Sequence, residues 1–203
     1  MGFGLLLIGY FIAYVIPVVE QLALAMPLGY VVILTALTLL SPYAKGFLLT
    51  RNVTIAALPV SLYYAVTGTA SWGVFTLPAW LTGAALSTTA EWYYFLFVLA
   101  FHVCLLRTLA TFTGEMGLPA LQAAAWRNLL IVVIYQALFL LLSLLLPLFS
   151  DYGGLFVLPL TLLRLVFVFL NIYLFFRCYR LILPEGSDAV VPDKKTDKTD
   201  KED

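Results

Sequence analysis

Charged residues are scarce in this sequence, and half of them lie at one end. Lys, Arg, Asp and Glu make up 11% of the 203 residues, whereas a soluble domain carries about 25%. Eleven of the 22 charged side chains fall within residues 184–203. Elsewhere no cluster of Lys and Arg is wide enough to follow a nucleic-acid backbone, so the sequence argues against DNA and RNA as partners.

Histidine and cysteine are also nearly missing. His102 is the single histidine, and the two cysteines, Cys104 and Cys178, lie far apart without a partner motif. The motifs HExxH and GxSxG and the Gly-rich phosphate loops are absent from the sequence. Metal sites and chemistries that need two histidines are therefore not indicated. We predict no catalytic residue, no cofactor and no metal, and the sequence leans away from an enzyme.

Apolar residues make up most of what is present. They account for 63% of the chain, and the mean hydropathy is +1.02. A membrane-spanning helix needs about 20 mainly apolar residues, and six segments reach or approach this length. These segments are Phe3–Val19, Leu22–Leu40, Val53–Ala70, Trp92–Phe112, Leu129–Phe149 and Leu155–Phe176. We therefore predict an all-α, polytopic transmembrane helix bundle with six spans, in which Pro17 and Pro27 shorten the first two helices.

The sequence divides into two parts. Residues 1–183 form the predicted transmembrane domain. Residues 184–203, PEGSDAVVPDKKTDKTDKED, contain too few apolar side chains to form a core, so we expect a disordered charged tail.

The basic residues near the ends of the apolar segments all belong to alternate junctions. Lys45, Arg51, Arg107, Arg127, Arg177 and Arg180 lie at the end of the second, fourth or sixth segment or in the junction after it, and they are all the basic residues outside the tail except Arg164. The other three junctions carry the acidic residues Glu20, Glu91 and Asp151. Because Lys and Arg near span ends stay on the cytoplasmic side, we predict a multi-pass protein of the cell (inner) membrane with both termini in the cytoplasm.

Two segments have an alternative interpretation. The triplet Ala23–Ala25 resembles a signal-peptide cleavage site, but the first 19 residues lack Lys and Arg, so we favour an uncleaved first helix. The uncharged segment 71–90 is interrupted by Gly73, Pro78 and Gly83. We expect it to form an external loop at the outer membrane surface, with a re-entrant loop as the alternative.

Arg164 is the most unusual residue, because it lies inside the last apolar segment. It is 13 residues from Arg177, or about 20 Å along a helix, which places it in the outer half of the bilayer. An arginine at the membrane centre costs about 2.5–3.5 kcal/mol, so a partner is expected. Asn171 follows two turns later on the same helix face. Glu91 and Glu20 are the candidate partners near the outer surface.

Two further polar residues lie at about the depth of Asn171, namely His102 and Gln136. The candidate polar site therefore consists of Arg164, Asn171, His102, Gln136, Glu91 and Glu20. One interpretation is structural: a clasp between Arg164 and a glutamate, with interhelical hydrogen bonds below it. The other is a site for an anionic or polar solute with Arg164 as its anchor.

The sequence favours a non-enzymatic structural or accessory membrane component. Its surroundings would be the lipid bilayer, with partner subunits or a second copy of the chain as protein contacts. The small residues Gly2, Gly9, Ala13 and Gly68 would then pack against partner helices. The alternative is a small-solute transporter or substrate-binding subunit, because six spans provide two three-helix halves of opposite orientation.

Overall fold

The computed structural model describes residues 2–18, 24–73, 75–145 and 153–182, and for 153–157 only the backbone. All regular structure in these residues is helical. The helices are α1 (Gly2–Tyr14), the short 3-10 helix η1 (Ile16–Val18), α2 (Ala25–Leu40), α3 (Lys45–Ile55), α4 (Ala57–Ala70), α5 (Ala84–Glu115), α6 (Pro119–Leu145) and α7 (Gly153–Leu181). The predicted tail, residues 184–203, and Glu20 and Asp151 lie outside the described residues.

Helices α3 and α4 continue one another as a single rod with a break at Ala56. Pro59 explains the break, because it has no N–H to offer the carbonyl of Ile55 and its ring crowds that carbonyl. The Ala56 N–H bonds instead to the Val53 carbonyl at 3.1 Å. The Tyr93 hydroxyl of α5 donates to the Ala56 carbonyl at 2.8 Å. This bond ties α5 to the backbone of the α3–α4 rod at its break.

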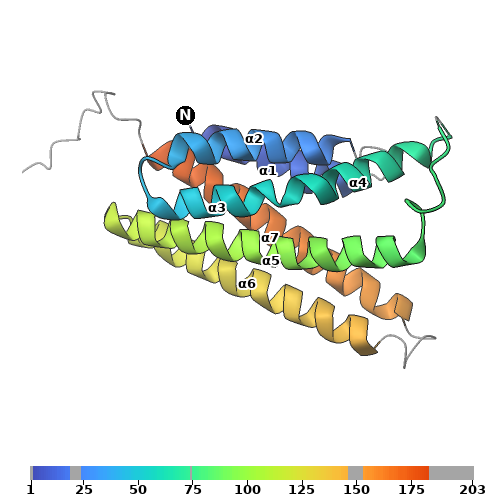
Figure 1. Cartoon of the computed structure of the whole chain (residues 1–203). Helices are drawn as coiled ribbons and strands as arrows, with labels where there is room; N and C mark the ends of the chain where they lie inside the picture. The colour runs from blue at the N-terminus through green and yellow to red at the C-terminus, as the bar shows by residue number, and fades with distance from the viewer. Residues whose placement is uncertain (1, 19–23, 74, 146–152, 183–203) are drawn as a thin grey trace, which may run out of the picture.

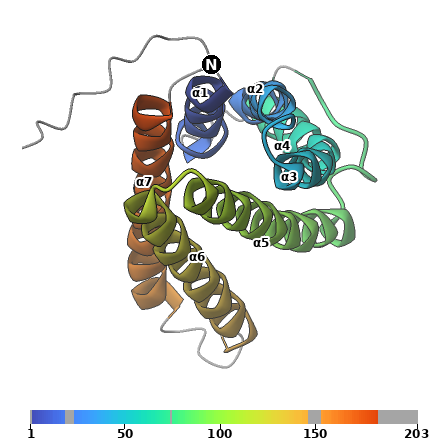
Figure 2. The same ribbon diagram turned by 90° about the vertical axis from the view of Figure 1, so that its left-hand side faces the viewer.

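The described helices form six rods in a closed ring. Going round the ring, α1 packs on α2, α2 on the α3–α4 rod, this rod on α5, α5 on α6, α6 on α7, and α7 on α1 (Figure 2). The rods run roughly along one direction, with α6 and α7 tilted away from α1 and α2 (Figure 1). The inner faces of all six rods therefore meet along one central axis.

Four helices are long and apolar enough to cross a membrane: Lys45–Ala70, Ala84–Glu115, Pro119–Leu145 and Leu158–Leu181. The first two predicted spans are shorter apolar helices, of 13 and 16 residues. Helix α1 ends at Tyr14, not at Val19, because Pro17 could not continue it without a clash at the Ala13 carbonyl. The shortening expected from Pro17 is thus confirmed.

The segment 71–90 was only partly predicted. Helix α5 begins at Ala84, so residues 84–90 are helical and the fourth predicted span started eight residues too late. The described residues of 71–83 form turns, and Gly73 adopts a φ of +75° in the first of them. At the far end of α5, Gly117 has a φ of +70°, and Pro119 is the first residue of α6, where its missing N–H leaves no helical bond unmade.

Helices α1 and α2 approach each other more closely than side chains would normally allow. A Cβ atom on Gly9 would lie 2.8 Å from the Ile33 nitrogen, and one on Gly29 would lie 2.7 Å from the Ala13 Cα. The small residues of α1 therefore pack against α2 within the same chain. The prediction that Gly9 and Ala13 pack against a partner subunit is wrong, because this contact leaves no room on that face.

The ring exposes apolar side chains outward and buries polar ones. Large apolar residues such as Leu144, Leu158 and Phe169 are more than half exposed. The buried polar residues are Thr50, Thr54, Ser61, His102, Thr113, Asn128, Gln136 and Asn171. A soluble protein rarely has such a continuous apolar surface. Together with the four long apolar helices, this pattern suggests membrane association.

Candidate functional site

The described residues hold two groups of polar side chains along the central axis. One is a network of hydrogen bonds that contains two of the predicted site residues, Asn171 and His102. The other is a cavity that contains three more, Arg164, Gln136 and Glu91. The sequence placed these residues in one site, and the structure separates them.

The polar network joins four helices through Asn128 (α6), Asn171 (α7), Tyr10 (α1) and His102 (α5). Asn128 Nδ2 donates to Asn171 Oδ1 at 3.1 Å and to the Leu170 carbonyl at 3.0 Å. Asn171 Nδ2 donates to the Tyr10 hydroxyl at 3.0 Å. The Tyr10 hydroxyl lies 2.8 Å from His102 Nε2. The four side chains thus connect helices that are far apart in the sequence.

The two hydrogen bonds of His102 determine which ring nitrogen carries the hydrogen. Its Nδ1 lies 2.7 Å from the Val98 carbonyl, which can only accept, so Nδ1 carries the hydrogen. Nε2 then accepts from the Tyr10 hydroxyl. Both ring nitrogens therefore have a partner, and neither is free to bind a ligand. The rings of Tyr14, Phe101 and Phe167 enclose the imidazole, with centroids 5.2, 5.2 and 5.6 Å away.

The polar network has the features of a structural connection. All four side chains are at most 1% exposed. A buried polar group stabilises a fold only when its hydrogen bonds are made, and here each link is made by the protein itself. The network therefore holds α1, α5, α6 and α7 in register.

The second group lines a cavity of about 360 Å³, which we call the Arg164 cavity. Eight of its 13 lining residues are aromatic, and Glu91 and Arg164 are its two charged residues. The lining comes from α1 (Tyr14), α4 (Tyr64), α5 (Glu91, Trp92, Tyr94, Phe95, Val98), α6 (Tyr135, Gln136, Phe139, Ser143) and α7 (Arg164, Phe167). The volume falls within the range of about 300–1,000 Å³ found for small-molecule sites.

The early end of α1 helps to explain why this space is open. Tyr14 is the last residue of α1 and lines the cavity, while α5, α6 and α7 continue beyond it. The Tyr14 ring stacks on Tyr10 at 4.5 Å and lies 6.2 Å from Phe101. Tyr14 thus closes the side of the cavity that adjoins the polar network.

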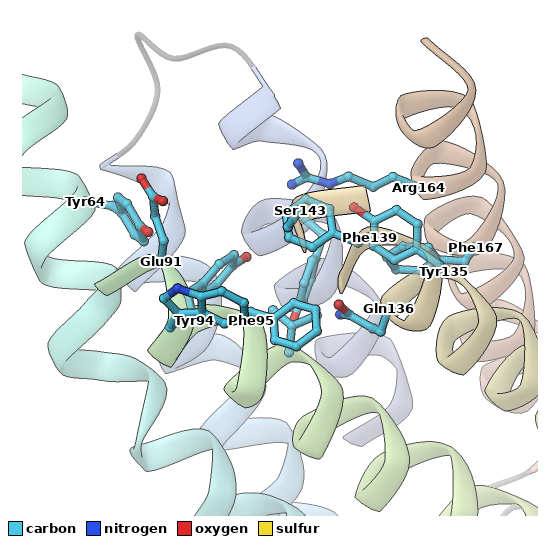
Figure 3. Close-up of a pocket in the computed structure, with 13 residues that line it drawn as sticks. Tyr64, Glu91, Tyr94, Phe95, Tyr135, Gln136, Phe139, Ser143, Arg164 and Phe167 are labelled. Carbon is cyan, nitrogen blue, oxygen red and sulfur yellow. The ribbon is translucent and has the colours of Figure 1, made fainter. Parts of the chain in front are cut away.

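The polar groups of the Arg164 cavity are not paired with one another. Gln136 is 4% exposed, and its Oε1 has no hydrogen-bond partner. Arg164 is half-buried and extends from α7 into the cavity (Figure 3). Glu91 is exposed on the opposite side, where Ser87 donates a long bond of 3.4 Å to it. Leaving a buried amide oxygen without a partner costs about 1–3 kcal/mol, so a hydrogen-bond donor that entered the cavity would be stabilised there.

The expected clasp between Arg164 and Glu91 is not formed in this structure. The two side chains line the same cavity from opposite sides without an ion pair between them. The other candidate acid, Glu20, lies outside the described residues. Asn171 and Cys178, which share the predicted helix face of Arg164, are both fully buried.

Tyr10 and Asn128 were not predicted as site residues. Tyr10 lies inside the first apolar segment, and Asn128 lies directly before the fifth. The signal that would have found Tyr10 is its hydroxyl, because a phenol buried inside a span needs a hydrogen-bond partner. The aromatic walls of the cavity gave no such signal, since they depend on which helices become neighbours.

Comparisons of this chain with protein families, with curated proteins and with solved structures found no match. The arrangement of its own residues is therefore what bears on its function.

Proposed function

We propose that this chain is an integral protein of the cell membrane whose six helical rods all cross the bilayer. The four long apolar helices support this proposal. The α2–α3 and α5–α6 turns and the end of α7 lie at one end of the bundle, and the α4–α5 connection lies at the other (Figure 1). The basic residues Lys45 and Arg177 belong to the first end and Glu91 to the second. This favours a cytoplasmic location for the first end and for both termini.

The short helices α1 and α2 fit this proposal with a local adjustment of the membrane. At 1.5 Å per residue they extend about 20 and 24 Å, whereas the hydrocarbon core is about 30 Å thick. Thinning of the bilayer around a short helix costs only a fraction of a kcal/mol per Å. The cost is therefore small beside the apolar surface that both helices bury.

Within this membrane protein, the Arg164 cavity is proposed to bind a small polar solute. The observation that carries this function is the buried amide oxygen of Gln136, which has no hydrogen-bond partner and lies in the same cavity as the half-buried Arg164 side chain. Polar groups at membrane depth are expensive unless they are paired or hydrated. A solute that paired with both groups would remove this cost, as a transporter or substrate-binding subunit requires.

A structural or accessory role is the second proposal. The polar network favours it, because its side chains are linked to one another and leave nothing exposed for chemistry. In both proposals the polar network holds α1, α5, α6 and α7 together. They differ on whether the Arg164 cavity admits water and solute from outside.

Cysteine labelling tests this difference. In a background with Cys104→Ala and Cys178→Ala, Phe139→Cys would place a thiol on the cavity wall, and Leu141→Cys would place one on the outer face of α6, where Leu141 is 52% exposed. We expect a membrane-impermeant maleimide, added to intact cells, to label Phe139→Cys. Leu141→Cys should stay unlabelled although it lies nearer the outer end of α6, because a thiol in hydrocarbon does not form the reactive thiolate.

Three other results would count against the proposal. If both thiols are labelled equally fast, α6 is not embedded in lipid. If neither is labelled, the cavity is closed to external water. If Phe139→Cys is labelled only in inverted vesicles, the cavity faces the cytoplasm and the proposed orientation is reversed.

A further inference from the structure

The two charged residues of the Arg164 cavity indicate the kind of solute that fits it. Arg164 on α7 and Glu91 on α5 lie on opposite sides of the cavity and do not pair with each other (Figure 3). We infer that the solute is a small zwitterion that carries its ammonium group and its carboxylate at opposite ends of an apolar body. This inference rests on the proposed function, since it names the solute class of the same cavity.

The Arg164 side of the cavity suits a carboxylate. A guanidinium presents parallel N–H groups that match the two oxygens of a carboxylate. Gln136 lies on the neighbouring helix α6, and its amide can turn either its oxygen or its NH₂ group toward a ligand. Figure 3 shows Arg164 and the Gln136 amide both directed toward the cavity. These two groups could therefore hold one carboxylate together.

The Glu91 side suits an ammonium group. Tyr64 lies beside Glu91 in Figure 3, and the rings of Tyr64 and Tyr94 meet at a centroid distance of 5.7 Å with an interplanar angle of 76°. Trp92, which follows Glu91 on α5, also lines the cavity. Aromatic faces next to a carboxylate attract a cation through both the ring quadrupole and the full charge. An anionic group would meet repulsion from Glu91 at the same place.

Aromatic rings form most of the rest of the cavity wall. Phe95 stacks on Phe139 at 5.7 Å, and Tyr135 packs on Phe167 at 5.0 Å. Such a surface accepts an apolar chain and offers it no hydrogen bond. A simple anion would satisfy Arg164 and leave Glu91 unpaired, whereas an amine would do the reverse. A zwitterion with separated charges pairs both, and the low dielectric of the membrane strengthens this selection.

Four probes of similar size test the inference on the full-length protein in nanodiscs. They are 6-aminohexanoate, its isomer norleucine with adjacent charges, hexanoate without the amine, and hexylamine without the carboxylate. Binding is measured by isothermal titration calorimetry and by the rise in Tm. We expect 6-aminohexanoate to bind roughly tenfold more tightly than each of the others. Hexanoate and hexylamine each lack one charged group, and the adjacent charges of norleucine cannot reach both sides of the cavity at once.

Neutral variants assign the two ends of the probe. Glu91→Gln should weaken the binding of 6-aminohexanoate until it equals that of hexanoate. Arg164→Gln should weaken the binding of 6-aminohexanoate until it equals that of hexylamine. Two matched controls carry the same chemical change outside the cavity: Glu115→Gln at the exposed end of α5 and Arg180→Gln near the exposed end of α7. Both controls should bind all four probes as the unmodified protein does.

The outcomes separate the inference from the proposed function. If hexanoate binds at least as tightly as 6-aminohexanoate and depends on Arg164, the solute is an anion, so the inference fails and the solute site stands. If norleucine equals its isomer, the separation of charges is wrong. If none of the four probes binds at millimolar concentration, both the inference and the solute site are rejected.

Discussion

The polar network and the Arg164 cavity both hold polar side chains between the helices, and they differ in whether these side chains are paired with one another. In the network, Asn128, Asn171, Tyr10 and His102 are linked by hydrogen bonds of 2.8–3.1 Å. In the cavity, Gln136 has an oxygen without a partner, and Arg164 and Glu91 face each other across open space. Polar groups that are paired with one another serve the fold, whereas unpaired ones are what a ligand site needs.

Replacing one amide by leucine in each region gives the largest expected contrast. Asn171→Leu removes two hydrogen bonds, so the Asn128 amide and the Tyr10 hydroxyl each lose one of their two partners. We expect it to lower the free energy of unfolding by about 2 kcal/mol. Unfolding in mixed detergent micelles, followed by circular dichroism, measures this change.

A double variant tests whether the two amides of the polar network interact. Asn128→Leu combined with Asn171→Leu removes both partners of one hydrogen bond, so its cost should be smaller than the sum of the single costs. Strict additivity would mean that the two amides do not interact, and the polar network would lose its central link.

Tyr10→Phe is expected to have the next largest effect on stability. It keeps the ring and its stacking on Tyr14, and it removes only the hydroxyl between Asn171 and His102. We expect a loss of about 1 kcal/mol in the free energy of unfolding, because two polar atoms lose one partner each. In the NMR spectrum, the His102 ring signals should shift. Tyr14→Phe serves as the control, since the Tyr14 hydroxyl takes part in one weak bond of 3.3 Å with Tyr30.

The smallest effect is expected in the cavity. Gln136→Leu makes the same amide-to-leucine change as Asn171→Leu, but it removes a group that has no partner for its oxygen. The free energy of unfolding without solute should stay within about 0.5 kcal/mol of the original value or rise. A loss as large as that of Asn171→Leu would show that Gln136 is structural, and the comparison between the two regions would fail.

The residue pattern predicted the elements better than their ends. Each of the six predicted apolar segments overlaps one helical rod of the described residues, because a long apolar run favours a helix. The ends depended on local chemistry that was only partly used. Pro17 was recognised as a helix terminator, whereas Gly83 was not recognised as the residue before α5. Membrane crossing by α1 and α2 stays a prediction, since their 13 and 16 residues are fewer than a full span.

The candidate site was predicted as a set of residue types and not as an arrangement. Arg164 and Gln136 were chosen because polar groups inside apolar segments are costly, and both line the cavity. His102 and Asn171 were chosen for the same reason, yet they belong to the polar network. The free-energy cost of a polar side chain inside an apolar segment does not reveal whether that side chain has a hydrogen-bond partner. That difference depends on which side chain of another helix stands opposite.

The sequence by itself determined a helical chain with an apolar exterior, and it determined which polar residues must be accounted for inside. Both follow from local properties: the length of apolar runs, the position of prolines and the distribution of charge along the chain. Only the tertiary structure decided that Tyr10 lies between Asn171 and His102 and that Gln136 faces a cavity. These facts depend on the order of helices around the ring, because a hydrogen bond or a cavity needs residues that are distant in sequence to meet at the same depth.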